Sequence, residues 1–549
     1  MRDSPLPDTS VVLELSDAFK DEGRPGLDQA KAAAQTRLER TMADLGMPGG
    51  VALTVTVADS PEERTSPLSI TVDGRRCRYP DELIGQLAEI ALGAHATTVP
   101  IPAEVAEEVR LTEDPAALPH FLACACEEIV KIHPSWLLSD SQAEAYGETL
   151  RASHGLSPTE WPPERLVPLL RALLELWIPI SDTGRLVSAL SASGGDPFER
   201  AIAALRPAEL HIELAAWLLH ALTEVDDSDR LASFDEMRQS VYDDLGVRLP
   251  ILRFSPVDAE ASTALRFRVN GLRTAPVLGL APDEVLIHLP WDNAKDLGVQ
   301  ARPAWDPWLG SVGAIVDISA QEALAQSVFM WNSWEHLVNM LGRAARQHAP
   351  KLVDMTTLEQ DLGVLVRDCP ELVGAARSQA TVDEVVATLR TLLAERVPVR
   401  DLPRIVRTAV EWHDTKYVPR PRLRSGYEPA SDNLPAFVRL ALAGQIAQQL
   451  TVDGSDTLLC HLIDPVTETM LVAADPLPEA DRVRFLTAVQ AGIQSQPPSF
   501  GSSVVLTSAS AREKVLAAIH EELPGVAVLA FDELPAQVMV DWQWLPVTS

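Results

Sequence analysis

Lysine is scarce in this 549-residue chain. It occurs seven times, which leaves 39 arginines among the 46 basic residues (46 − 7). The basic residues are outnumbered by 78 acidic ones, and the formal net charge is −32. A surface of this kind repels nucleic-acid phosphates and anionic lipid headgroups. We therefore expect neither nucleic acid nor a membrane surface as a partner.

Cysteine is rare as well, with five residues in the chain. An odd number spread over a long chain does not suit a disulfide framework and predicts a reducing compartment. Cys124 and Cys126 lie two positions apart in a predicted helix, so their side chains diverge, and no neighbouring pair completes a tetrahedral metal site. We expect both to be buried thiols, and we predict no metal or other cofactor.

Long apolar runs are absent. No stretch approaches the roughly 18 uninterrupted apolar residues that a membrane-spanning helix needs, and the most apolar window, residues 166–180, contains Arg171 and Glu175. The N-terminal residues Met1 to Pro7 have no apolar signal core. The sequence thus predicts a cytoplasmic protein that is not inserted in a membrane.

Catalytic and phosphate-binding motifs are also missing. G-x-S-x-G, G-x-x-x-x-G-K-S/T and G-x-G-x-x-G do not occur. The acidic stretch 224–229 lacks the glycine and the final glutamate of a calcium loop, and we expect a solvated linker with a helix cap there. These absences predict a protein that is not an enzyme. An active site without a recognisable motif is the alternative, because a fold does not determine function.

What the chain does contain is an internal repeat. At 549 residues it is too long for a single hydrophobic core, and its 46% apolar and 23% charged content is ordinary for folded domains. Two Asp-Leu-Gly triplets, 44–46 and 244–246, each end a predicted helix, and alternating strand-like segments follow at 51–57 and 249–254. The same order of elements is therefore predicted twice.

Further landmarks recur in the same order. A strand-like segment closes on Asp73-Gly74 in the first repeat and on Asn270-Gly271 in the second, and both dipeptides are strong hairpin signals. In the helical part, residues 131–137 parallel 346–352, and residues 173–187 parallel 392–406. The latter pair predicts a helix that ends ahead of proline, an apolar elbow and an aspartate that caps the next helix. The matching histidines, 133 and 348, are expected to bond a neighbouring loop.

These landmarks predict a multidomain α+β fold without a transmembrane segment. Each repeat is expected to consist of an α+β subdomain and a helical subdomain, and the first repeat, at about 10–220, is the degenerate one. The predicted subdomains are 1–118 and 119–223 in the first repeat, 234–345 with an insertion at 285–330 and 346–425 in the second, and a C-terminal α/β subdomain at 435–549. The acidic stretch separates the repeats, and the Pro- and Arg-rich residues 420–433 form a linker.

The second repeat also contains an ordered set of short motifs: Leu245-Gly246, Pro282-Asp283, Arg346-Gln-His-Ala349, Val397-Pro-Val-Arg-Asp-Leu402, Val505-Leu-Thr-Ser508 and Val528-Leu-Ala-Phe-Asp-Glu-Leu-Pro535. In this set, residues 234–549 resemble the soluble domain of the FHIPEP family, the export-gate proteins of flagellar and type III secretion systems. Members of that family carry an N-terminal membrane domain that this sequence does not show, so we do not expect the chain to be the gate itself. The resemblance implies linked subdomains without a catalytic site, which form a ring and dock export substrates, chaperones or stalk components.

Two functional hypotheses follow. The first is a cytoplasmic scaffold of a bacterial secretion system that self-associates as a homo-oligomer or docks protein partners. The second is an adaptor in a prokaryotic defence or signalling complex that has reused the same fold.

Six residues are candidates for partner binding. Trp291, Trp305 and Trp308 are concentrated in the insertion, and tryptophan is enriched at interaction hot spots, although a local core is the alternative. The other three, Arg400, Asp401 and Arg404, follow the second elbow and could form an ion pair between subunits. A helix cap flanked by solvated arginines is the alternative there.

Overall fold

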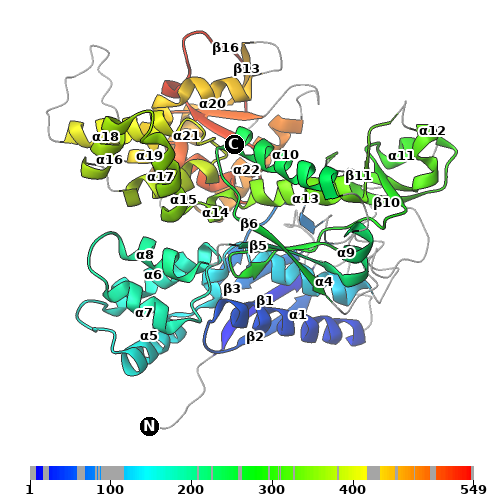
Figure 1. Cartoon of the computed structure of the whole chain (residues 1–549), viewed down its shortest axis with the longest axis horizontal. Helices are drawn as coiled ribbons and strands as arrows, with labels where there is room; N and C mark the ends of the chain where they lie inside the picture. The colour runs from blue at the N-terminus through cyan, green and yellow to red at the C-terminus, as the bar shows by residue number, and fades with distance from the viewer. Residues whose placement is uncertain are drawn as a thin grey trace. The chain divides into compact units, whose positions relative to one another are not determined.

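The computed structural model of the chain is shown in Figure 1. The residues it describes are 8–15, 24–57, 68–80, 83–84, 87, 117–206, 209–223, 227–257, 263–294, 297–306, 308–309, 311–324, 328–379, 382–416, 433–451, 456–474, 476–494 and 503–545. The chain divides into two compact units, residues 1–243 with 248–354 and residues 244–247 with 355–549. Within the described ranges no helix is both long and apolar enough to cross a bilayer. The predicted linker 420–433 lies outside them, except for Asn433.

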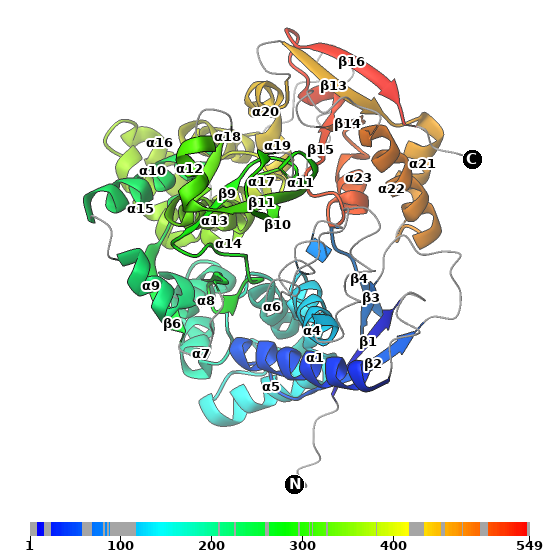
Figure 2. The same cartoon turned by 90° about the vertical axis from the view of Figure 1, so that its right-hand side faces the viewer.

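The first sheet is built by the N-terminal part of the chain. Its elements are β1 (Thr9–Leu15), α1 (Arg24–Leu45), β2 (Val51–Val57), β3 (Leu68–Val72) and β4 (Arg75–Cys77). The strand order is β2-β1-β3-β4, in which β1 is parallel to β2 and antiparallel to β3. The turn between β3 and β4 is the predicted one, because Asp73 and Gly74 have φ angles of 46° and 79°, as a tight hairpin requires. The helix α1 lies against β2 (Figure 2).

The second sheet repeats this arrangement. Its elements are β5 (Glu209–Ala215), α9 (Ala216–Thr223), α10 (Asp227–Leu245), β6 (Ile251–Val257), β7 (Arg266–Val269) and β8 (Leu272–Arg273). The order is β6-β5-β7-β8, in which β5 is parallel to β6 and antiparallel to β7. Thr9 pairs with Val51 and Glu209 with Ile251, so both paired strands recur 200 residues later (209 − 9 and 251 − 51). The predicted repetition of an α+β unit is confirmed in strand order, direction and register.

The boundary predicted between the repeats is wrong. Strand β5 lies between β6 and β7, so the second repeat begins before residue 209, and residues 119–223 are not one helical subdomain. Residues 227–229 of the acidic stretch form the start of α10. The strand alternates apolar and polar residues, but it lies ahead of the acidic stretch 224–229 that we took as the boundary between the repeats.

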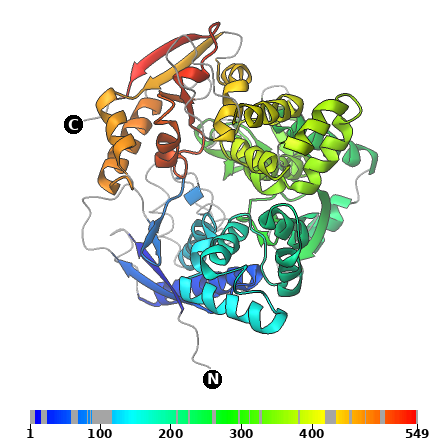
Figure 3. The same ribbon diagram turned by 90° about the vertical axis from the view of Figure 1, so that its left-hand side faces the viewer.

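The first repeat continues as a group of helices, drawn in cyan to teal in Figure 3. They are α4 (Ala117–Val130), the 3-10 helix η2 (Pro134–Leu137), α5 (Asp140–His154), α6 (Pro163–Glu175), α7 (Thr183–Ser191) and α8 (Pro197–Leu205). Helix α4 packs along α1, where Arg37 forms an ion pair with Glu127 at 2.9 Å. Cys124 and Cys126 are buried in α4 as predicted, and burial raises the pKa of the Cys124 thiol to about 11.

A third sheet coincides with the predicted insertion at 285–330. Its elements are β9 (Glu284–Ile287), α11 (Trp291–Ala294), β10 (Ala301–Asp306), β11 (Ser311–Asp317), η4 (Ile318–Ala320), α12 (Gln321–Leu324) and β12 (Met330–Asn332). The strands are antiparallel in the order β10-β11-β9-β12. Next come α13 (Ser333–Gln347), which Asn332 and Glu335 begin with a capping box, and α14 (Ala349–Leu352).

The second unit contains the remaining helices and the C-terminal sheet. The helices are α15 (Met355–Leu365), α16 (Pro370–Gln379), α17 (Val382–Ala394), α18 (Leu402–Lys416), α19 (Leu434–Ala441) and α20 (Ala443–Leu450). The C-terminal part comprises β13 (Thr457–Leu462), α21 (Pro465–Ala473), α22 (Glu479–Gln494), β14 (Val504–Thr507), α23 (Arg512–Ile519), β15 (Ala527–Ala530), η5 (Phe531–Glu533) and β16 (Met539–Trp544). Its strands are parallel in the order β15-β14-β13-β16, and α-helices form the crossovers from β13 to β14 and from β14 to β15.

Candidate functional site

The three tryptophans predicted for partner binding occupy different environments. Trp291 is only 9% exposed and packs into the core of the inserted sheet with residues of β9, β11 and α12. Trp305 belongs to β10, and its side chain lies outside the described residues. Trp308, in the turn between β10 and β11, is 66% exposed. Of the three, only Trp308 is shown at the surface, and Trp291 has the core role that we gave as the alternative.

The inserted sheet has two unlike faces. Alternate residues of β9, Val285 and Ile287, point into the apolar core beneath α11. The opposite face continues from Leu286, which pairs with Trp331 of β12, to His288, whose backbone N–H donates to the Phe329 carbonyl at 2.9 Å. Aromatic side chains from the end of β9 and the start of β12 are therefore brought together on this second face.

Three aromatic rings surround the imidazole of His288. Its ring centroid lies 5.1 Å from that of Phe329 in a stacked geometry, 4.1 Å from that of Trp331 and 6.1 Å from that of Trp308. The three outer rings are 5.8 to 6.3 Å apart and steeply inclined to one another, as edge-to-face aromatic packing favours. Trp308 and Phe329 are 66% and 60% exposed, whereas Trp331 is buried. We call Trp308, Phe329 and Trp331 the aromatic patch.

A buried hydrogen bond between His288 and Asp306 fixes the position of the imidazole among the three aromatic rings. The Nδ1–H of His288 donates to Oδ2 of Asp306 at 2.8 Å, and the two side chains are 2% and 0% exposed. The other carboxylate oxygen accepts from the backbone N–H of Trp308 at 2.8 Å and from that of Leu309 at 3.3 Å. Asp306 thereby fixes both the imidazole and the turn that carries Trp308. A side chain at Gly313 would meet Asp306 at 2.9 Å, so glycine leaves room for the carboxylate.

A second buried histidine lies behind the patch. His336 of α13 donates from Nε2 to the Leu278 carbonyl at 2.7 Å, and its ring centroid is 6.1 Å from that of Trp331. Its Nδ1 is buried without a hydrogen bond among the described atoms. Burial lowers the pKa of His336 to about 4, because the charged ring would lose its hydration. At neutral pH this histidine is therefore uncharged.

The protein is expected to lose stability as the pH falls from 6.5 to 4. Folding lowers the pKa of His336 from 6.5 to about 4. Between these two pH values the histidine is protonated in the unfolded chain but not in the folded chain, so a fall in pH stabilises the unfolded state relative to the folded state. The loss is at most on the order of 3 kcal/mol for a shift of this size. Urea unfolding at several pH values measures it. His336→Gln, which keeps a donor for Leu278, should flatten this part of the profile; an unchanged profile would contradict the assignment.

Sequence reasoning missed most of this site. Phe329, His288 and Asp306 are separated by 18 to 41 residues in the chain (306 − 288 and 329 − 288), and only the antiparallel register brings them together. A weak signal was present, because Phe329 and Trp331 are two positions apart and would share one face of a strand. Nothing in the sequence indicated which face would be exposed.

The other three predicted residues lie in the second unit. Oδ1 of Asp401 accepts from the backbone N–H of Arg404 at 3.2 Å, so this carboxylate caps the start of α18. Asp182 caps α7 in the same way, with Arg185 as the donor at 3.0 Å. Arg400 and Arg404 are exposed. The described contacts thus agree with the helix cap that we gave as the alternative, and an ion pair between subunits stays a prediction.

In the described part of the chain, no three His, Cys, Asp or Glu side chains are grouped so that they could hold a metal ion. The aromatic patch exposes Trp308 and Phe329 to solvent, while its histidine and carboxylate are hydrogen-bonded and buried. Such an arrangement suits the binding of a protein surface through aromatic contacts.

Known proteins resemble much of this chain. The FHIPEP family matches residues 192–539, which is more than half of the chain. The hypersensitivity response secretion protein HrcV of Ralstonia nicotianae is 26% identical over 322 residues, covering 56% of this chain and 44% of HrcV. The secretion system apparatus protein SsaV of Salmonella typhimurium is 21% identical over 377 residues, covering 66% of this chain and 51% of SsaV. The chain thus spans about half the length of these two relatives.

Solved structures share the fold. The CdsV protein of Chlamydia pneumoniae is 19% identical with a TM-score of 0.50, over 61% of this chain and 96% of that structure. CdsV in its complex with CdsO is 20% identical with a TM-score of 0.51, over 62% of this chain and 97% of that structure. The family match begins at residue 192, ahead of β5, in agreement with the corrected boundary between the repeats. Because that match covers most of the second repeat and the C-terminal subdomain, the chain belongs to the FHIPEP family.

Proposed function

We propose that this chain is a non-enzymatic scaffold that docks a protein partner on the aromatic patch. The observation that carries the proposal is the exposure of Trp308 and Phe329, at 66% and 60%, on a face that a buried hydrogen bond holds in place. Large rigid rings bury much apolar area on binding and lose little conformational freedom, which is why they dominate interface energies. Two such rings side by side support an interaction site at this face.

The family supports a partner that is itself a protein. CdsV, whose fold this chain shares, has been solved in a complex with CdsO, so that protein binds another protein. The relatives HrcV and SsaV are named as secretion proteins. We infer that this chain serves a type III secretion system in the cytoplasm as a docking component.

Local chemistry favours binding over catalysis at this site. His288 and Asp306 could act as a base and its orienting group, but their side chains are 2% and 0% exposed beneath the rings. A substrate would have to displace those rings to reach the imidazole. The pair therefore has a positioning role in this proposal.

Truncation of the patch should weaken partner binding by roughly tenfold or more, as expected for loss of a hot spot. Trp308→Ala and Phe329→Ala would be compared with the wild-type chain by isothermal titration calorimetry, with a partner first identified by affinity purification from the source cell. Trp217→Ala is the matched control, because Trp217 is also exposed, at 41%, but lies on α9 outside the patch. Wild-type affinity in both patch variants, with native melting temperatures, would reject the patch as the docking site.

A further inference from the structure

Lys351 of α14 lies where the two repeats meet within the first unit. Asn270, in the turn between β7 and β8, donates from Nδ2 to the Leu176 carbonyl at 2.6 Å and to the Lys351 carbonyl at 3.1 Å. The next backbone N–H, that of Gly271, donates to the Trp177 carbonyl at 3.1 Å. These hydrogen bonds hold the backbone of Lys351 beside the residues that follow α6.

The amine of Lys351 faces an aromatic ring and not a carboxylate. Its Nζ lies 4.4 Å from the centroid of the Trp177 ring, which is within cation–π distance. The ring is buried, and its Nε1–H donates to the Lys131 carbonyl at 3.2 Å, so its position is fixed. Among the residues that the structure describes, no carboxylate forms an ion pair with the Lys351 amine.

The carboxylate that acts on this amine from a distance, Glu175 at the end of α6, is engaged elsewhere. Its Oε1 accepts a hydrogen bond from the Ser135 hydroxyl, and its Oε2 lies 3.5 Å from Nδ1 of His133. Glu175 favours the charged form of Lys351, but it does not reach the ammonium as a direct partner.

The other titratable groups beside Lys351 offer it no negative charge. His348 contacts the Trp177 ring at a centroid distance of 4.8 Å, and burial holds the pKa of this histidine well below its usual range. His348 is therefore uncharged at neutral pH. Arg206 and Asp354, which follow α8 and α14, neutralise each other in an ion pair of 2.6 Å.

This environment favours the free amine of Lys351. Burial lowers the pKa of its ammonium to about 8, because the charged group loses hydration that the ring does not replace. At pH 7.5 about a quarter of the Lys351 side chains then carry a free amine, against on the order of 0.1% for a lysine of ordinary pKa. A desolvated neutral lysine is a nucleophile. Lys351 is partly exposed, so a small reagent can reach it.

We propose that Lys351 is a site of covalent acylation by a small activated acyl donor, an acyl phosphate or an acyl thioester. The free amine attacks the carbonyl carbon of the donor, and an N–C bond forms. The bond from that carbon to the phosphate oxygen or to the thioester sulfur breaks, and the leaving group departs with its electron pair. The amine proton passes to solvent. This site is separate from the aromatic patch and does not depend on the docking function proposed above.

The product of this reaction is an amide that carries no charge. Acylation therefore removes the cation–π contact between Lys351 and Trp177. The hydrogen bonds of Asn270 remain, because they use backbone carbonyls. Acylation of this lysine thus weakens the contact between the two repeats without abolishing it.

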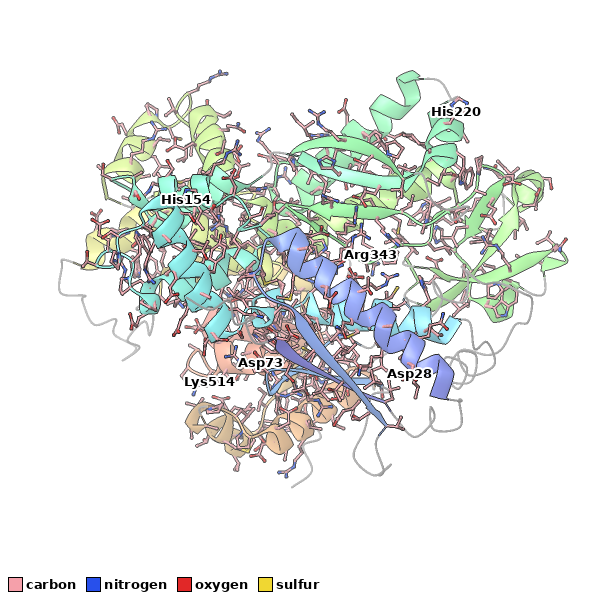
Figure 4. All side chains as sticks on the ribbon, turned by 90° about the horizontal axis from the view of Figure 1, so that it is seen from below. Asp28, Asp73, His154, His220, Arg343 and Lys514 are labelled. Atoms are coloured by element: carbon pink, nitrogen blue, oxygen red, sulfur yellow. The ribbon has the colours of Figure 1, made fainter. Side chains whose placement is uncertain are left out.

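Other lysines of the chain serve as internal controls. The Nζ of Lys131 lies 2.7 and 2.8 Å from carboxylate oxygens of Glu127 and Glu128, and although burial opposes it, these two charges raise the pKa of Lys131. Lys514 of α23, labelled in Figure 4, donates from Nζ to two backbone carbonyls at 2.6 and 3.2 Å. Lys31 of α1 is exposed, so its amine is accessible to any reagent.

The full chain would be treated with acetyl phosphate and, in a separate arm, with acetyl-coenzyme A at pH 7.5. Because the chain has seven lysines, mass spectrometry can follow acetylation at each one. We expect Lys351 to react at least about tenfold faster than Lys31, and faster than Lys131 and Lys514, with at least one donor. The donor that gives the faster reaction identifies the class that the site takes. The rate at Lys351 should rise with pH and level off above about pH 8.

A substitution beside the amine tests the physical cause. His348→Glu places a carboxylate three residues before Lys351, which should favour the ammonium and slow its acetylation at least about fivefold. His348→Gln is the matched control without the charge, and it should react like the wild-type chain. Circular dichroism shows whether each variant is folded; if His348→Glu is not, the pH profile of the wild-type chain decides. A wild-type Lys351 that reacts no faster than Lys31 with either donor, or whose rate still rises at pH 10, would overturn the proposal.

Discussion

Replacing Gly46 with alanine is expected to lower the free energy of unfolding by roughly 3 to 5 kcal/mol, among the largest effects of any single substitution in this protein. Gly46 follows α1 with a φ of 71°, a conformation that costs other residues roughly 1 to 2 kcal/mol. A Cβ there would lie 2.4 Å from the backbone nitrogen of Ser181 and 2.5 Å from its Cα. Backbone atoms cannot rotate away, so the elbow would have to shift and break the Ile180 to Leu45 hydrogen bond of 2.8 Å.

Gly155→Ala is the matched control for this substitution. Gly155 ends α5 with a φ of 72°, but a Cβ there would meet no described atom within 4 Å. Gly155→Ala should therefore lower the free energy of unfolding only by the cost of the left-handed backbone, roughly 1 to 2 kcal/mol. Urea unfolding followed by circular dichroism compares the two variants. Equal losses would mean that the left-handed φ alone, and not the contact with the elbow, makes glycine necessary at position 46.

The same glycine occurs in the second repeat, which explains why the Asp-Leu-Gly triplet was recognisable in the sequence. Gly246 has a φ of 78°, and its Cβ would lie 2.4 Å from the backbone nitrogen of Arg400. In both repeats the helix end, the elbow and the capping aspartate form one contact. Residues held by such backbone requirements vary little in type, so a repeated unit can be predicted from them without an alignment.

The central strands of the first two sheets, β1 and β5, were not predictable, because no local motif fixes their positions. Strands β1 and β5 are seven residues each, and both are central in their sheets because of pairing with segments more than 30 residues away. Neither has a turn motif like Asp73-Gly74 beside it, and the acidic stretch 224–229, which we took as the boundary, lies after β5. The start of the second repeat was for this reason placed too late, at residue 234.

The candidate site was predictable only in its location. The concentration of tryptophan at 291–308 indicated the insertion, which the structure shows as a separate sheet. Burial then divides the residues, because Trp291 faces the apolar core and Trp308 the solvent. Which side of a strand faces the solvent depends on the neighbouring elements, and a one-residue change of register would exchange the two faces. The residues that hold the patch, His288 directly after β9 and Asp306 at the end of β10, have no motif of their own.

Arg439→Met should destabilise the second unit by about 3 to 5 kcal/mol, the usual result of breaking a buried ion pair on one side. Arg439 of α19 is 2% exposed, and its Nε donates to Glu533 at 2.6 Å. Its Nη1 donates to Glu395 at 2.7 Å, and Arg512 donates to the same carboxylate at 2.6 Å. Without Arg439, Glu395 keeps Arg512, whereas among the described contacts Glu533 keeps the backbone N–H of Ala530 at 2.9 Å and no cation. The loss therefore comes chiefly from an uncompensated charge on Glu533.

This reasoning makes a double variant informative. Arg439→Met combined with Glu533→Leu removes the stranded carboxylate, so most of the lost stability should return, because apolar side chains of similar size can replace a buried ion pair. Arg377→Ala is the matched control: its partner Glu359 lies at 2.6 Å, but the side chains are 48% and 43% exposed, and such pairs contribute less than about 1 kcal/mol. Urea unfolding measures all three variants. If the double variant is as unstable as Arg439→Met, the arginine stabilises the second unit by its packing between α19 and η5 and not by neutralising Glu533.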